Sequence, residues 1–325
     1  MGGGYWDSDG YKTATTTRAK TGVDDFDYSK KNSSIHENLD PKRINGKPFG
    51  KLESRDSVDH PLSNAIFLGL DVTGSNIDNA KQAQKALGLL MDMLPKYISD
   101  PQVAIAANDD YFASGLNAIQ IADFESDNRV DEHLRNLLLV GNGGGNHQES
   151  YDLLLYAAAR KTILDCFEQR GHKGYLILYA DEPIPKTIAP KTVLDIFGDS
   201  ISESISIATI IEEARRLYDV FILWPANGYQ DARDQYVKLL GNEFVITLKD
   251  PTKICEAICG IVGINESAVT IDEAERDLIS AGVDKKTASG ISQALIPLSQ
   301  IKSVARPISG LPGVGGGKKG GAKRL

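Results

Sequence analysis

The segment Asn64-Ala65-Ile66-Phe67-Leu68-Gly69-Leu70-Asp71-Val72-Thr73-Gly74-Ser75 decides the fold class of this chain. An apolar run of strand length ends on the carboxylate of Asp71, and the hydroxyls of Thr73 and Ser75 follow at alternate positions. In an open α/β sheet, ligands bind where the carboxyl ends of strands meet the following helices. One carboxylate and two hydroxyls there offer the oxygen ligands that Mg²⁺ prefers. The segment therefore predicts a buried strand followed by a cation-binding loop. The alternative is that Asp71 caps the next helix and the hydroxyls belong to a turn.

Strand-like and helix-like patterns alternate through the central part of the chain. The expected strands cover residues 65–70, 103–107, 118–121, 175–179, 220–224 and 244–248. The expected helices cover residues 80–97, 131–138, 149–169, 207–218, 231–240 and 252–262. This alternation predicts an α/β fold with a mostly parallel central sheet and helices on both faces. The polar turn Asn108-Asp109-Asp110 predicts one antiparallel strand at the sheet edge.

Charge is unevenly spread and divides the chain into segments. Residues 1–60 carry ten basic and ten acidic side chains with little periodicity, so we expect an extended, partly disordered segment. Residues 61–301 carry 20 Lys and Arg against 34 Asp and Glu, which argues against a nucleic-acid enzyme because phosphate contacts need a basic face. Residues 302–325 carry six basic and no acidic side chains, so this tail could contact nucleic acid or an acidic partner, and we expect no nucleic-acid contact elsewhere. The expected units are a domain at 61–264, a C-terminal helical hairpin at 265–302, and a basic Gly/Lys-rich disordered tail at 303–325.

Two amphipathic helices are expected after the central domain, at residues 267–281 and 285–298, on either side of Gly282. Their apolar residues predict a helical hairpin that packs on the central domain or lies beside it. The alternative is a small protein-binding module.

The sequence offers no catalytic constellation. It lacks the phosphate-binding pattern G-x-x-x-x-G-K-[ST], so we expect no nucleotide hydrolysis. Asp71-Val72-Thr73 differs from the D-x-D of phosphotransferases, because Thr73 stands where those enzymes have their acid/base aspartate. His147 and Glu149 lie close in sequence, but a lone loop histidine is more often a bystander than a base. We find no nucleophile–base pair and expect that the protein is not an enzyme.

The chain has the features of a cytoplasmic protein without membrane contact. No stretch approaches the ~20 apolar residues of a membrane span. The N-terminal residues Met1-Gly2-Gly3-Gly4-Tyr5-Trp6 contain no signal-peptide core. Cys166, Cys255 and Cys259 lie in apolar contexts without zinc-site partners, so we expect buried, reduced thiols.

Three further stretches accompany the opening segment in a fixed order. They are the glycine-rich loop Gly143-Gly144-Gly145-Asn146-His147-Gln148-Glu149, the strand 175–179 followed by Ala180-Asp181-Glu182-Pro183, and the hairpin 104–110 leading to Phe124-Glu125-Ser126-Asp127. Together with D-x-T-x-S these motifs resemble the loops of bacterial von Willebrand factor A (vWA) domains that carry a metal-ion-dependent adhesion site. The resemblance covers roughly two hundred residues and implies a Rossmann-like fold.

The resemblance also implies a metal site. Thr73 and Ser75 would bind the cation directly, and Asp71 and Asp181 would bind it through water, because Mg²⁺ dehydrates reluctantly. Asn146 stands in the matching place of the family's second loop, where the usual residue is threonine, or aspartate in the G-G-G-D variant. Because its side chain is neutral, the site carries one negative charge fewer than a site with aspartate at this position. The expected cofactor is Mg²⁺, or Mn²⁺ or Ca²⁺ in its place. In this family a carboxylate of the protein ligand often completes the shell.

The segment Glu53-Ser54-Arg55-Asp56-Ser57-Val58-Asp59-His60-Pro61 extends the resemblance to bacterial vWA proteins thought to work with MoxR-type AAA+ ATPases or in conflict-type systems. That resemblance implies a metal-dependent adaptor that recognises an Asp or Glu of a partner protein. The alternative is a structural scaffold whose vWA fold binds partners independently of metal.

Overall fold

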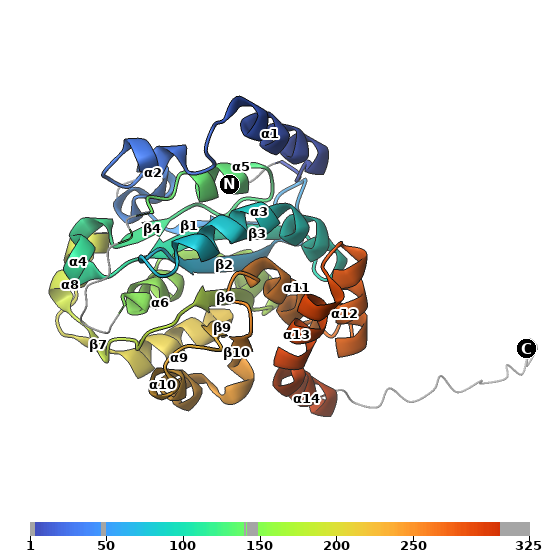
Figure 1. Cartoon of the computed structure of the whole chain (residues 1–325). Helices are drawn as coiled ribbons and strands as arrows, with labels where there is room; N and C mark the ends of the chain where they lie inside the picture. The colour runs from blue at the N-terminus through green and yellow to red at the C-terminus, as the bar shows by residue number, and fades with distance from the viewer. Residues whose placement is uncertain (1–3, 47–49, 140, 142–148, 306–325) are drawn as a thin grey trace, which may run out of the picture.

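A six-stranded sheet forms the centre of the molecule. The computed structural model describes residues 4–46, 50–139, 141 and 149–305. The strand order is β10-β9-β6-β2-β3-β4, with every neighbouring pair parallel except β3 and β4 (Figure 1). The strands are β2 (Asn64–Asp71), β3 (Pro101–Asn108), β4 (Ile119–Ile121), β6 (Gly174–Tyr179), β9 (Tyr218–Pro225) and β10 (Val245–Leu248). The predicted fold class is confirmed, including the single antiparallel strand at the sheet edge.

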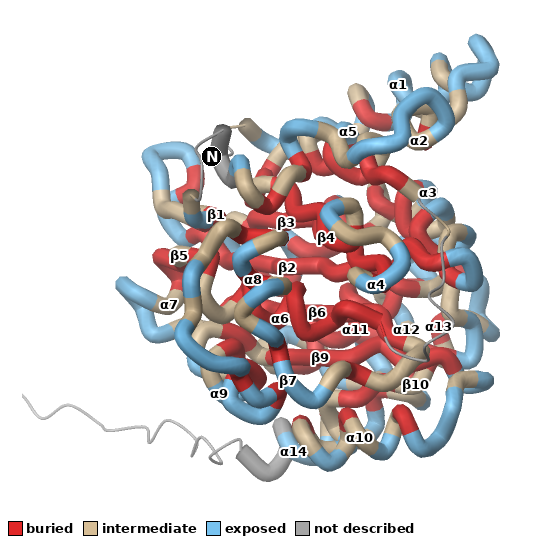
Figure 2. Tube along the Cα trace, turned by 90° about the vertical axis from the view of Figure 1, so that its left-hand side faces the viewer, coloured by how far each residue is buried: buried red, intermediate tan, exposed pale blue. Residues whose placement is uncertain are grey.

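Helices cover both faces of this sheet, which explains why its strands are continuous apolar runs. Along β2, Ile66, Leu68 and Leu70 pack with one set of helices, whereas Ala65 and Phe67 pack with the other. The first face holds α3 (Ile77–Met93), α5 (Arg129–Arg135) and α11 (Ile254–Asn265). The second face holds α6 (Tyr151–Arg160), α9 (Ile207–Leu217) and α10 (Gln230–Leu240). Figure 2 shows the buried strands in red between these helices.

Short elements connect these layers. They are η3 (Leu94–Lys96), α4 (Tyr111–Ser114), η4 (Gly115–Asn117), β7 (Thr187–Ile188), α8 (Pro190–Phe197), β8 (Ile205–Ser206) and η5 (Asn242–Phe244). The three cysteines are buried and form no disulfide, as the sequence predicts. No helix of the described part of the chain is long and apolar enough to cross a membrane.

The single helix predicted at residues 149–169 is wrong. Helix α6 ends at Arg160, strand β5 (Thr162–Leu164) follows, and α7 (Asp165–Arg170) completes the segment. Strand β5 pairs in parallel with β1 (Leu52–Ser54), which belongs to the segment before the central domain. A tertiary pairing with a distant segment therefore overrides the helical periodicity.

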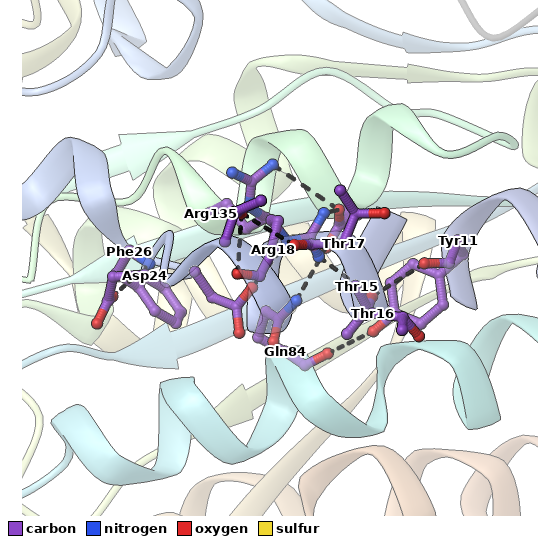
Figure 3. Close-up of polar contacts among 12 residues, drawn as sticks. Tyr11, Thr15, Thr16, Thr17, Arg18, Asp24, Phe26, Gln84 and Arg135 are labelled. Carbon is purple, nitrogen blue, oxygen red and sulfur yellow. Dashed lines mark hydrogen bonds and ion pairs between the residues drawn. The ribbon is translucent and has the colours of Figure 1, made fainter. Parts of the chain in front are cut away.

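The expectation of an extended segment at residues 1–60 is also wrong for the described residues. They form α1 (Ser8–Thr21), α2 (Asp27–Lys31), η1 (Glu37–Leu39), η2 (Pro41–Gly46) and β1. Helix α1 docks on α3 and α5, where the Tyr11 hydroxyl donates to the Gln84 carbonyl at 2.9 Å and Arg18 contacts Asp131 at 3.1 Å (Figure 3). Gln84 Nε2 also donates to Asp131 at 3.0 Å. The docking is mostly polar, so it leaves little apolar periodicity in the sequence.

The C-terminal segment forms three helices instead of the two predicted. They are α12 (Ile271–Ser280), α13 (Lys285–Ala294) and α14 (Ile296–Ala305), and they pack against α11. Pro297 lacks the amide that would continue α13, so a new helix begins there. Gly282, with φ of 95°, makes the turn between α12 and α13. Of the two predicted arrangements, the structure has the helices packed on the central domain through α11. Most of the predicted tail, residues 306–325, lies outside the described residues.

Candidate metal centre

The candidate site lies where the strand order of the sheet reverses. Strand β2 has β3 on one side and β6 on the other, so the connections that follow β2 and β6 leave in opposite directions along the sheet. Such a switch point is where ligands bind in open α/β sheets. Asp71 is the last residue of β2, and Asp181 follows the end of β6 by two residues. The two predicted carboxylates therefore come from neighbouring strands.

The first loop folds around the carboxylate of Asp71, which is 1% exposed. Its Oδ1 atom accepts hydrogen bonds from the Thr73 amide at 2.8 Å and the Thr73 hydroxyl at 2.6 Å. A side chain at Gly74 would place its Cβ 3.0 Å from the carbonyl oxygen of Gly141, so the glycine allows the two loops to approach. Ser75 is exposed, so the loop keeps one hydroxyl open to solvent.

Asn76 joins the predicted residues into one cluster. Its Nδ2 atom lies 3.3 Å from Thr73 Oγ1, 3.1 Å from Ser75 Oγ and 2.9 Å from Asp181 Oδ2. Asn79 fixes the orientation of this amide by donating to Asn76 Oδ1 at 3.0 Å. Asn76 was not among the predicted ligands, although it follows D-x-T-x-S directly.

Tyr151 is the second residue that the sequence analysis missed. Its hydroxyl lies 2.6 Å from Asp71 Oδ2 and 3.1 Å from Asp181 Oδ1. A phenol has one proton, so it can donate fully to only one of these carboxylates at a time. Tyr151 begins α6, immediately after the glycine-rich loop. This position in the sequence is the feature from which its place at the site could have been predicted.

The electrostatics of the cluster favour an added positive charge. Burial, and then the neighbouring charge of Asp181, raises the pKa of Asp71 to about 7. Burial, followed by Asp71 and other acidic neighbours, raises the pKa of Glu149 to about 9. Burial raises the pKa of Asp109 to about 6. A bound cation would favour the ionised forms of these groups.

Unpaired buried oxygens provide a test of whether the residues fit a cation. Among the described residues, Asn108 Oδ1, Asp110 Oδ2 and Glu149 Oε2 are buried without a hydrogen-bond partner. Asn108 ends β3 directly beside Asp71 in the register of the sheet. Carboxylates, hydroxyls and amide oxygens without His or Cys are a donor set for a hard cation. The residues therefore fit Mg²⁺ better than a transition metal.

The structure brings four of the five predicted ligands together: Asp71, Thr73, Ser75 and Asp181. The fifth, Asn146, lies outside the described residues. Within the described ranges, no three His, Cys, Asp or Glu side chains are arranged to hold an ion by themselves. A cation at this place would therefore depend on the hydroxyls of Thr73 and Ser75 and on water.

Comparisons with known proteins give distant structural similarities. No protein-family model and no curated protein matches the sequence. Proximal thread matrix protein 1 from the mussel byssus is 11% identical with a TM-score of 0.42, covering 63% of this chain and 48% of its own. The pilus adhesin SpaC from Lactobacillus rhamnosus GG is 12% identical with a TM-score of 0.42, covering 66% and 31%. A von Willebrand factor type A protein from Catenulispora acidiphila is 14% identical with a TM-score of 0.38, covering 62% and 42%. The chain spans less than half the length of each, and these similarities assign it neither a family nor an activity.

Proposed function

We propose that this chain is a protein-binding adaptor in which a divalent cation at Thr73 and Ser75 captures an Asp or Glu of a partner protein. The observation that carries the proposal is the meeting of Asp71, Thr73, Ser75 and Asp181 at the switch point of the sheet. The domain binds and does not catalyse.

Each residue has a role in this proposal. Thr73 and Ser75 give hydroxyl oxygens to the ion, and Asp71 and Asp181 orient its water molecules. Asn146, if it contributes, adds a neutral oxygen and no charge. This shell is short of anionic ligands, so a carboxylate from outside completes it. Mg²⁺ is the preferred ion because it usually keeps several waters and is held by one or two protein carboxylates.

Exposed apolar side chains near the site support a protein partner. Phe112 is 81% exposed and Leu116 is 57% exposed, and both lie in the connection that follows β3. Tyr111 fixes this connection by donating from its hydroxyl to Asp195 of α8 at 2.6 Å. Exposed aromatic and aliphatic side chains beside a polar centre are typical of protein interfaces. The proposed partners include a MoxR-type AAA+ ATPase in the cytoplasm, as the sequence resemblance implies.

The test is capture of partner proteins from the native host with Mg²⁺ and with EDTA. We expect partners that are lost in EDTA and lost with Thr73→Ala in the presence of Mg²⁺. Thr252→Ala is the matched control, because Thr252 is a turn threonine whose hydroxyl donates to Asp250 in the same way. Partners retained equally in all conditions would contradict the proposal.

One observation favours a second candidate, a metal-independent scaffold. Asn76 donates a hydrogen bond to Asp181 and Tyr151 donates one to Asp71, so groups of the protein compensate both carboxylates. In that case partners bind through the surface around Phe112, and Phe112→Ala weakens capture equally with and without EDTA.

A further inference from the structure

A cavity of about 880 Å³ lies between the carboxyl end of β10 and the start of α13, apart from the candidate metal centre. In the sheet, β10 is one of the two edge strands, separated from β2 by β9 and β6. The volume falls within the range of about 300–1,000 Å³ that is common for small-molecule sites. The proposed adaptor function leaves this cavity unused.

The lining of the cavity is basic, although the protein as a whole is acidic. Four lysines line it, against two aspartates, whereas the whole chain has a formal net charge of −8. The four are Lys249, Lys253, Lys285 and Lys286. Lys249 donates to Gln293 at 2.9 Å, and Lys253 lies 3.3 Å from Glu256. A local excess of cations on an acidic protein attracts an anion.

The remaining two lysines lie where a helix disfavours them. Lys285 and Lys286 occupy the first turn of α13, which has no acidic side chain there, and both are exposed. The amino end of a helix carries partial positive charge, so lysines at this position are unfavourable unless an anion lies nearby. Asp284 caps the helix by accepting from the Thr287 amide at 3.0 Å. The carboxylate of Asp284 is therefore used to cap the helix terminus.

The other lining residues suit an organic ligand. Thr287 and Ser289 add hydroxyls on the same helix, and Leu248 and Ile291 add buried apolar surface. Gly290 also lines the cavity, and a Cβ built there would meet no atom within 4 Å. The cavity therefore offers cations and hydroxyls for an anionic group beside apolar surface for the rest of the molecule.

We propose that this cavity binds the phosphate of an organic ligand of nucleotide size. The lysines of α13 and Lys253 hold the phosphate, Thr287 and Ser289 donate to it, and Leu248 and Ile291 contact the organic part. Lysine acts here as a point charge for phosphate. The phosphate belongs to a free nucleotide or to a phosphodiester of a nucleic acid, and the two sources differ in the size of the bound molecule.

Calorimetric titration of the full chain tests the proposal, in EDTA so that the candidate metal centre does not contribute. The probes are ATP, inorganic phosphate and a single-stranded oligonucleotide. We expect ATP to bind more tightly than inorganic phosphate, and binding to weaken as salt increases. If the oligonucleotide binds more tightly than ATP, the natural ligand is a nucleic acid and not a free nucleotide. No heat of binding with any probe at millimolar concentration overturns the proposal.

Two variants locate the binding. Lys285→Ala with Lys286→Ala should weaken binding at least tenfold, whereas Lys20→Ala with Lys238→Ala, which removes the same charge from exposed positions elsewhere, should leave it unchanged. Equal weakening by both pairs shows non-specific attraction and overturns the proposal. Gly290→Leu should narrow the cavity and weaken binding while keeping the melting temperature, because leucine favours a helix more than glycine does. Unchanged binding by this folded variant also overturns the proposal.

Discussion

The hydroxyl of Tyr151 lies between the carboxylates of Asp71 and Asp181. Removal of this hydroxyl by mutation tests the role of a single hydrogen bond. Tyr151→Phe keeps the buried ring but leaves Asp71 with one donor fewer. Without metal, we expect a loss of about 1–3 kcal/mol in the free energy of unfolding, because a buried charge loses a partner. Millimolar Mg²⁺ should then raise the melting temperature more than in the wild type, since the ion replaces the missing donor. Tyr218→Phe, at the start of β9, is the control. An equal Mg²⁺ effect in all three proteins would contradict this expectation.

Asp71 also makes the stability of the folded protein depend on pH, and the direction follows from its raised pKa. Its pKa in the folded protein is about 7, mainly because of burial and then the charge of Asp181. In the unfolded chain the pKa of an aspartate is about 3.9. The folded state binds this proton more tightly, so stability falls as pH rises from about 4 to 7 and then levels off. Thermal unfolding in EDTA between pH 4 and 8 measures this slope. Asp71→Asn should flatten part of it, whereas the exposed Asp272→Asn should not. The same slope in both variants would show that Asp71 is not responsible.

At the scale of elements, an ion pair between Arg18 and Asp131 helps to position α1, beside the hydrogen bond from Tyr11 to Gln84. The side chains of Arg18 and Asp131 are 11% and 9% exposed, and they join α1 to α5. We expect Arg18→Ala to weaken the docking of α1 by about 1–3 kcal/mol, because the charged hydrogen bond to Asp131 is lost. Gln84 still donates to Asp131, which limits the effect. Hydrogen exchange of residues 8–21 should accelerate while exchange in β2 and β6 stays slow. Lys20→Ala, on the exposed side of α1, is the control; equal protection in both variants would mean that the other contacts of α1, such as Tyr11 with Gln84, hold the helix without Arg18.

At the scale of the whole molecule, the three C-terminal helices are part of the main core. Every residue of α11 is buried, and α12, α13 and α14 pack against it. Ending the chain after Glu266 therefore exposes an apolar helix, and we expect aggregation in size-exclusion chromatography. Ending it after Ala305 removes only residues 306–325, and the melting temperature should not change. A monomeric, cooperatively folded protein ending at Glu266 would show that the central domain is independent.

The sequence predicted the sheet well because its strands are buried on both faces and leave unbroken apolar runs. It predicted Asp71 and Asp181 as neighbours because Asp71 ends one strand, Asp181 follows another, and the carboxyl ends of the two strands share an edge. Asn76 and Tyr151 could not be found in this way, because their roles depend on side chains meeting across different loops. Strand β5 was missed for the same reason, since its partner β1 lies more than a hundred residues earlier.

The pairing of β1 with β5 has a consequence for synthesis of the protein on the ribosome. The first sixty residues leave the ribosome before the segments that they contact in the folded protein have been synthesised. Helix α1 docks on α3 and α5, and β1 pairs with residues 162–164. At about 5–20 residues per second, roughly 5–20 s separate the appearance of β1 from that of its partner. During this interval a nascent chain exposes the unpaired edge of β1 and the ring of Tyr11, which is buried in the folded protein. The N-terminal segment is therefore a place where chaperones can bind before the sheet closes.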